Sequence, residues 1–249
     1  MLVSPMFRCI LMGAISILGL TIATHGWGGI VVSGTRVVYP ADQREVSVRL
    51  TNEGESPVLV QAWLDQGDPT VKPEHISVPF TLTPPVFRMD PQRGQTMRLM
   101  YTKEPLPQDR ESVYWLNVLE IPPKPANQEV NQLQLAFRTR IKVFFRPKEL
   151  AGSAAKAPSN VTWALTPIAN GQTYSLTATN PTPYAVSFSK VLLKSEDQTY
   201  IAESGMVKPF ESVEFVLKNI KHPLQGRLQV LYQSITDYGG SVDGTATLK

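Results

Sequence analysis

The stretch "LQLAFRTRIKVFFRP", residues 133–147, alternates apolar and basic side chains with a period of two. Its apolar side chains are Leu133, Leu135, Phe137, Ile141, Val143 and Phe145. Its cationic side chains are Arg138, Arg140, Lys142 and Arg146. Because successive side chains of a β-strand point to opposite faces, this pattern predicts one long strand with an apolar face and a cationic face. The fold must cover the first face and provide partners for the second.

Similar short alternating segments occur along the rest of the chain. Examples are "REVSVRLTNEG" at 44–54, "SPVLVQAWLD" at 56–65 and "SVYWLNVLEI" at 112–121. The chain also has 21 prolines and 16 glycines, and no helical period of useful length is present. Many short strands with turn residues between them indicate an all-β protein built from antiparallel sandwiches.

A break in composition divides the chain at "KELAGSAAKAPSN", residues 148–160, which lacks alternation and resembles a linker. Beyond it the strand pattern restarts. The segment at 174–192 repeats the order of strand, Thr-Asn, turn and strand that is found at 46–64, which suggests two sandwiches of one type. We therefore predict two immunoglobulin-like β-sandwich domains, residues 29–149 and residues 150–249.

The N-terminus has the features of a secretory signal peptide. Arg8 precedes an apolar run at 9–24, and small residues and glycines follow. We predict a signal peptide over residues 1–28, with cleavage between Ala23 and Gly29. An uncleaved membrane anchor is the alternative, but no second apolar stretch of about 20 residues follows, so the mature protein should have no membrane span.

Charge and reactive groups argue against several classes of function. The net charge of +3 is mild and no basic run stands apart, which disfavours a nucleic-acid partner. The only cysteine, Cys9, lies in the predicted leader, so neither disulfide nor thiolate chemistry is expected. His75 and His222 are isolated in turn-like segments, and no metal-binding or nucleophile motif is present. We predict no enzyme activity, no metal site and no cofactor.

The stretch "LPQDRESVYWLNVLEIPP" at 106–123 resembles a segment of the bacterial periplasmic pilus-assembly chaperones. Further matches are "TRVVYP" at 35–40, "TPPVFRMDP" at 83–91, "IKVFFRP" at 141–147, "NPTPY" at 180–184 and "TDYGG" at 236–240. The resemblance covers essentially the whole mature chain. It implies two immunoglobulin-like domains in an L or boomerang arrangement, in a periplasmic protein that binds pilin subunits and delivers them to an outer-membrane usher. The short connection "KPANQEVNQ" at 124–132 resembles the short-loop branch of the family.

The resemblance also divides the apolar row of the opening stretch. Taken alone, the pattern is explained most simply if all six apolar side chains face the core of their own domain. The resemblance instead implies that Leu133, Leu135 and Phe137 form a donor strand at a sheet edge and complete the fold of a pilin subunit. An exposed apolar edge invites pairing, so a dimer that caps this edge without a client is a further expectation.

Several polar residues acquire expected roles from their motif positions. The resemblance implies that Arg36 and Lys142 anchor the C-terminal carboxylate of the subunit, although ordinary surface charges are the alternative. It implies an inter-domain charge network of Arg98, Glu111, Arg146 and Asp237, although solvated carboxylates are again the alternative. It also makes Pro84 a candidate cis-proline. The competing function is a structural or adhesive component of a pilus or cell surface.

Overall fold

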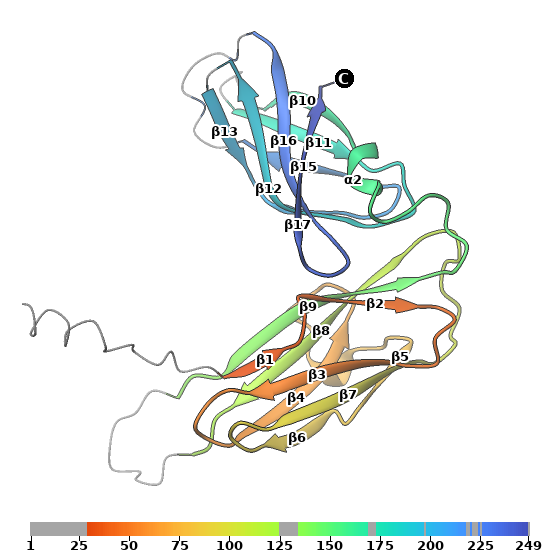
Figure 1. The fold of residues 1–249 in the computed structure, drawn as a ribbon, viewed down its shortest axis with the longest axis vertical. Helices are drawn as coiled ribbons and strands as arrows, with labels where there is room; N and C mark the ends of the chain where they lie inside the picture. Colours follow the sequence, from red (N-terminus) through yellow and green to blue (C-terminus); the bar gives the residue numbers. More distant parts are fainter. Residues whose placement is uncertain are drawn as a thin grey trace, which may run out of the picture.

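The computed structural model describes residues 29–124, 134–168, 173–196, 198–217, 220, 224 and 226–248. The predicted signal peptide, His222, Leu133 and most of the 124–132 connection lie outside these residues. The described chain folds into two β-sandwich domains that meet at an angle, so the predicted all-β L-shaped architecture is confirmed (Figure 1). No helix among the described residues is long and apolar enough to cross a membrane.

The N-terminal domain consists of two facing sheets. The first has the strand order β1 (Ile30–Val32), β3 (Val46–Asn52), β7 (Gly94–Tyr101) and β5 (Phe80–Thr83). The second has the order β2 (Arg36–Pro40), β9 (Phe137–Arg146), β8 (Ser112–Ile121), β4 (Val58–Asp65) and β6 (Val86–Met89). A 3-10 turn, η1 (Pro73–His75), follows β4, and the Thr83–Pro84 peptide bond between β5 and β6 is cis.

The C-terminal domain is a second sandwich. One sheet has the order β10 (Thr162–Ile168), β11 (Thr173–Thr179) and β15 (Ser212–Val216). The other has the order β13 (Gln198–Ala202), β12 (Val186–Ser195), β16 (Leu228–Ile235) and β17 (Ser241–Thr247), with β14 (Gly205–Val207) also paired to β12. A short helix, α2 (Ala157–Asn160), precedes β10.

Period-two alternation explains why these segments form strands with one buried face. In β4 the side chains of Val58, Val60, Ala62 and Leu64 are buried, whereas Leu59 is 44% exposed. Each domain has its own apolar core, one running from Val37 to Phe145 along the sequence and the other from Ala157 to Tyr232. Two separate cores give each domain its own source of hydrophobic stabilisation.

The neighbours of β9 change along its length. β8 pairs with β9 from Phe137 to Phe145, but β2 pairs with it in parallel only from Lys142 to Arg146. The strand that precedes β2 in the chain, β1, pairs with β3 in the opposite sheet. Among the strands that the structure describes, residues 137–141 therefore have a hydrogen-bonded neighbour on one side only, and this half of β9 is a sheet edge.

Candidate functional site

The apolar row of the opening stretch is divided at this edge. Leu135 and Phe137 are 55% and 62% exposed, whereas Ile141, Val143 and Phe145 are buried. The simple interpretation, in which all six apolar side chains face their own core, is therefore wrong for Leu135 and Phe137. Leu133 lies outside the described residues. The strand itself begins at Phe137, so the prediction of a strand from residue 133 was too long at its start.

Two cations lie together where β2 and β9 meet. Arg36 and Lys142 are direct partners in the parallel ladder, so they occupy the same face of the sheet. Arg36 Nη1 donates a hydrogen bond to the carbonyl oxygen of Ile235 at 3.1 Å. Lys142 Nζ donates to Ser187 Oγ at 3.3 Å. Because Ile235 and Ser187 belong to the C-terminal domain, both cations lie at the junction between the domains.

A cleft of about 370 Å³ opens at this junction. Its lining includes Arg36 and Lys142, the Trp115 ring from β8, and Ile235 and Gly239 from the C-terminal domain. It is thus formed by both domains and lies beside the edge half of β9.

Burial perturbs both cations of the cleft. It lowers the pKa of Lys142, and the nearby charge of Arg36 lowers it further. Burial also lowers the pKa of Arg36, against the opposing effect of Asp237 and Glu111. The Nε of Arg36 is buried and has no hydrogen-bond partner among the described residues. An anion bound beside Arg36 and Lys142, such as a carboxylate, would relieve the repulsion between the two cations.

Three of the four residues predicted for the inter-domain network come together. Arg146 Nε donates to Glu111 Oε1 at 2.5 Å, and its two terminal nitrogens donate to the carboxylate of Asp237 at 2.7 and 2.8 Å. Glu111 Oε2 accepts a hydrogen bond from the backbone N–H of Ala185 at 2.8 Å. The Arg146 guanidinium also lies 5.4 Å from the centre of the Tyr184 ring. These contacts tie the last residue of β9 to two segments of the C-terminal domain.

The cluster is partly buried, and its two carboxylates outnumber its one guanidinium. Burial alone would lower the pKa of Arg146, but the hydrogen bonds and charges of Asp237 and Glu111 raise it above the ordinary arginine value. Burial raises the pKa of Glu111, while Arg146 and the Ala185 N–H oppose the rise. The side chain of Glu111 is only 1% exposed, so the alternative of a solvated Glu111 is wrong.

Arg98 does not belong to this cluster, and its predicted place in the network is wrong. Its side chain is 55% exposed, and its carboxylate partner is Glu45 at 3.7 Å. Arg98 lies on β7, in the sheet opposite to the one that carries Arg146. Its position within a motif could not indicate which sheet it would occupy.

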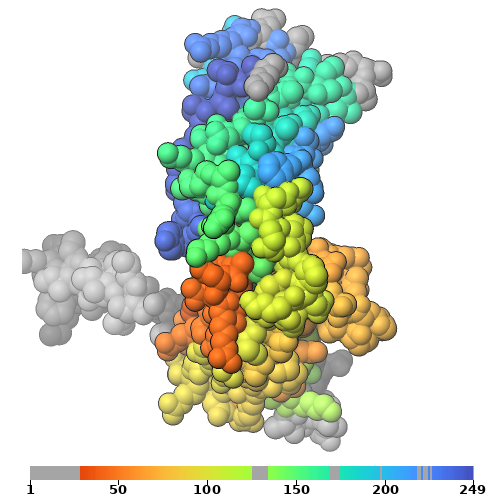
Figure 2. All heavy atoms as spheres, turned by 90° about the vertical axis from the view of Figure 1, so that its right-hand side faces the viewer, coloured from red at the N-terminus to blue at the C-terminus, as the bar shows by residue number. Residues whose placement is uncertain are grey.

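The segment before β8 makes junction contacts that the sequence analysis missed. Figure 2 shows this yellow-green segment against the C-terminal domain. The backbone N–H of Glu111 donates to the carbonyl of Pro183 at 2.9 Å, and the Arg110 guanidinium lies 4.9 Å from the Phe210 ring centre. No local pattern relates residues so far apart in the sequence.

Arg138 and Arg140, whose roles the sequence left open, lie in a connected polar cluster on the outer face of β9. Their partners include Asp65 and Asn117, both buried. A buried carboxylate at the end of an otherwise apolar strand was the available signal, because a buried Asp needs a partner. His75 lies in η1, and no group of three metal-ligating side chains occurs among the described residues.

An open apolar strand edge, a cationic cleft and a domain junction held by ion pairs define a two-domain binding protein. Residues 29–151 match the family model described as "Pili and flagellar-assembly chaperone, PapD N-terminal domain", and residues 156–246 match "Pili assembly chaperone PapD, C-terminal domain". The chain therefore belongs to the pili assembly chaperone family, whose members are periplasmic chaperones and not enzymes. The predicted boundary between residues 149 and 150 stays a prediction.

Individual relatives agree with this assignment. The chain is 50% identical over 223 residues to the probable fimbrial chaperone YadV of Escherichia coli K12, covering 88% of this chain and 89% of the relative. It is 41% identical over 225 residues to the chaperone protein FimB/FhaD of Bordetella pertussis, covering 88% of each. The crystal structure of the YadV chaperone matches with a TM-score of 0.76 and 45% identity, covering 88% of this chain and 99% of that one. The CupB2 chaperone of Pseudomonas aeruginosa matches with a TM-score of 0.73 and 39% identity, covering 88% and 100%.

Proposed function

We propose that this protein is a periplasmic chaperone that binds pilin subunits, completes their fold with its own edge strand and delivers them to an outer-membrane usher. Residues 1–28 would direct export and be removed. Family membership supports the general role. The open edge of β9, with Leu135 and Phe137 exposed along it, is the observation that carries the more specific claim.

The edge is suited to strand addition. Strand donation to an incomplete subunit is the established mode of chaperone–pilin recognition: backbone hydrogen bonds extend the partner's sheet, and alternate side chains enter its groove. Here Phe137–Ile141 leave one side of β9 without a described neighbour. Burying Leu133, Leu135 and Phe137 in such a groove would contribute about 2 kcal/mol each before ordering costs.

The inter-domain cleft would bind the terminal carboxylate of the subunit. Arg36 offers a planar guanidinium and Lys142 a compact ammonium on the same sheet face, a combination suited to a terminal carboxylate. The subunit's C-terminus would bind there while its open groove receives the β9 edge. The ion cluster of Glu111, Arg146 and Asp237 would maintain the domain arrangement that forms this cleft.

A more distant structural relative gives a precedent for such a partner. The SafB chaperone was solved in complex with the SafA pilin of Salmonella enterica, and it matches this chain with a TM-score of 0.72 and 23% identity. In the absence of a pilin, the same exposed edge of this protein would pair with a second copy of itself.

Capture of a pilin in the periplasm tests the function. The full chain is co-expressed with candidate pilins, and a stoichiometric complex is expected to co-purify. Leu135→Asp should abolish capture while leaving the fold intact, because a carboxylate cannot enter an apolar groove without a large desolvation cost. Ile201→Asp is the matched control, since Ile201 is 62% exposed on β13 of the other domain. Equal capture by the Leu135→Asp variant would contradict the proposed donor strand.

A further inference from the structure

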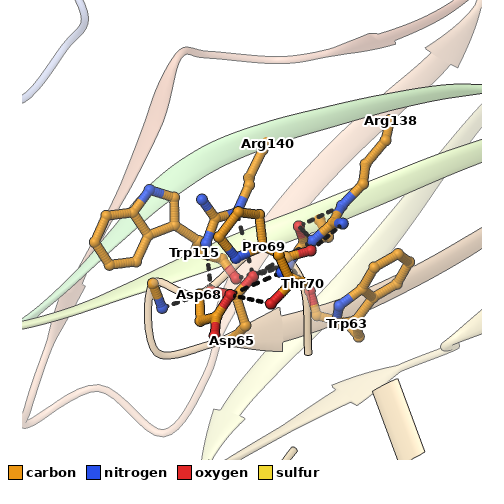
Figure 3. Close-up of polar contacts among 10 residues, drawn as sticks. Trp63, Asp65, Asp68, Pro69, Thr70, Trp115, Arg138 and Arg140 are labelled. Carbon is orange, nitrogen blue, oxygen red and sulfur yellow. Dashed lines mark hydrogen bonds and ion pairs between the residues drawn. The ribbon is translucent and has the colours of Figure 1, made fainter. Parts of the chain in front are cut away.

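Arg138 and Arg140 project from β9 on the face opposite to Phe137 and Ile141, because side chains alternate along a strand. Figure 3 shows both arginines reaching toward Asp65, with Trp115 on one side and Trp63 on the other. The Arg138 guanidinium lies 4.9 Å from the Trp63 ring centre, and that of Arg140 lies 5.0 Å from the Trp115 ring centre. Each guanidinium therefore lies over an aromatic ring, that of Trp63 on β4 or that of Trp115 on β8.

Hydrogen bonds join the two arginines into a single network. Arg140 donates to both carboxylate oxygens of Asp65, at 2.5 and 3.2 Å, and Asn117 donates to the same carboxylate at 2.7 Å. Arg138 donates twice to Asn117 Oδ1, at 2.6 and 2.9 Å. Its third nitrogen donates to the carbonyl of Pro69 at 2.8 Å. We call Asp65, Asn117, Arg138 and Arg140 the arginine clamp.

The arginine clamp spans three strands and a loop. Asp65 ends β4, Asn117 lies in the middle of β8, and the arginines belong to β9. The loop after β4 is held as well, because the Gly67 N–H donates to Asp65 Oδ1 at 2.6 Å. The Asp65 side chain is 2% exposed, so losing its cations would leave a buried carboxylate without charge compensation.

The position of the clamp along β9 relates it to both parts of the proposed binding site. It lies between the exposed Phe137 and the cleft cation Lys142, in the half of the strand that lacks β2 as a neighbour. A slip of one residue would turn both arginines toward the core, and a slip of two would carry Phe137 and Lys142 together by about 7 Å relative to Arg36 and the C-terminal domain. Bidentate guanidinium contacts tolerate neither shift, because they depend on direction as well as distance.

We propose that Arg138 and Arg140 are positioning residues that lock the register of β9, so that the donor side chains and the cleft cations engage one pilin at the same time. This inference rests on the proposed function. A partner held at two points gains from the second contact only when the spacing between the two points is correct. Asp65, Asn117 and Arg138 lie outside the cleft lining and hold Phe137 and Lys142 in position relative to Arg36, whereas Arg140 also lines the cleft.

The test compares an intact pilin with a pilin lacking its C-terminal residue. In the wild-type chaperone the truncation should weaken binding by about tenfold or more, because the new terminal carboxylate lies one residue further from the cleft cations. In Asp65→Asn, Arg138→Gln and Arg140→Gln, the ratio between the two pilins should fall toward one. Arg88→Gln is the matched control, since Arg88 is an exposed arginine on β6 that pairs with Asp90. A purely structural role would lower the melting temperature and leave the ratio unchanged.

Hydrogen exchange provides a second readout that does not require a client. Amides of residues 137–141 should exchange faster in the Arg138→Gln variant, while those of the C-terminal domain remain unchanged. Arg138→Gln is the mildest variant, since the Arg138 side chain is already 30% exposed. A wild-type ratio above tenfold that persists in all three variants would overturn the clamp and leave the proposed function standing. Equal binding of both pilins by the wild-type chaperone would contradict the carboxylate anchor and the clamp, whereas failure of the intact pilin to bind at all would contradict the proposed function.

Discussion

Arg36 and Lys142 face each other directly across the parallel ladder of β2 and β9, with the C-terminal domain against both. Two cations on one sheet face repel each other, and burial weakens the solvation that would screen them. The free protein therefore carries an electrostatic cost at this point, which a bound carboxylate would remove.

The first prediction concerns this pair. Arg36→Ala should weaken the binding of a pilin with an intact C-terminus by roughly ten- to a hundredfold, as expected for losing a charge-assisted hydrogen bond. Titration calorimetry with purified pilin measures the change. Arg98→Ala is the control, because Arg98 is exposed, pairs with Glu45 and lies on β7 in the opposite sheet. Equal affinities for wild type and Arg36→Ala would rule out the carboxylate anchor.

The second prediction is a loss of affinity at alkaline pH. The pKa of Lys142 is lowered by burial and by Arg36, so its ammonium loses its proton below the ordinary lysine value of 10.5. Below that pKa the ammonium is charged and binds a carboxylate, and above it the contact is lost. Pilin affinity should therefore fall as pH rises through this pKa. Lys142→Arg should abolish the fall, because a guanidinium stays charged. Parallel pH profiles for the two proteins would contradict the assignment.

The third prediction concerns the client-free protein. Phe137→Asp should suppress self-association at high concentration, because the exposed apolar edge is what a second copy would pair with. Analytical ultracentrifugation of the wild type and the variant measures this. Ile201→Asp, equally exposed in the other domain, should leave the association unchanged. If the wild type stays monomeric at millimolar concentration, the self-capping dimer is excluded.

The fourth prediction concerns the domain junction. Arg146→Ala should destabilise the protein by about 3–5 kcal/mol, because it leaves the buried Glu111 carboxylate without its cation. Urea unfolding measures the loss, and small-angle scattering should show a wider spread of domain orientations. Arg98→Ala should cost less than about 1 kcal/mol, as is usual for an exposed pair. A comparable cost for both variants would argue against a structural role of the cluster.

The fifth prediction tests the packing of the hairpin between β16 and β17. Gly239 has a φ of +82°, and a Cβ there would lie 2.5 Å from Thr35 Oγ1 in the N-terminal domain. Gly239→Ala should therefore open the junction and weaken pilin binding. Thr35→Ala in the same chain should relieve the clash but not the backbone strain, giving partial rescue. Full activity of the single variant would show that the hairpin moves freely.

Much of the fold followed from alternation alone. The buried faces of β4, β8 and the second half of β9 are the apolar faces that a period of two predicts, because a half-buried strand must separate apolar from polar side chains. The point at which β9 becomes an edge was not predictable from its own residues. It is set by where β2 begins, at Arg36 opposite Lys142, which depends on tertiary pairing.

Some residues of the candidate site could likewise be predicted from the sequence, and others could not. Motif positions brought Glu111, Arg146 and Asp237 together correctly but misplaced Arg98, since a motif gives order along the chain and not the sheet face. The contact between Asp65 and Arg140 joins residues 75 positions apart. No local spacing rule relates such residues, so only the folded structure reveals the clamp.

The five-residue length of β2 has a consequence for engineering. Each further residue by which β2 paired with β9 would cover part of the open edge. A sufficiently long β2 would pair with all of β9 and leave no edge for a partner strand. The length of β9 edge that is open to a partner strand could therefore be adjusted through the length of β2, without changing the side chains that face the partner.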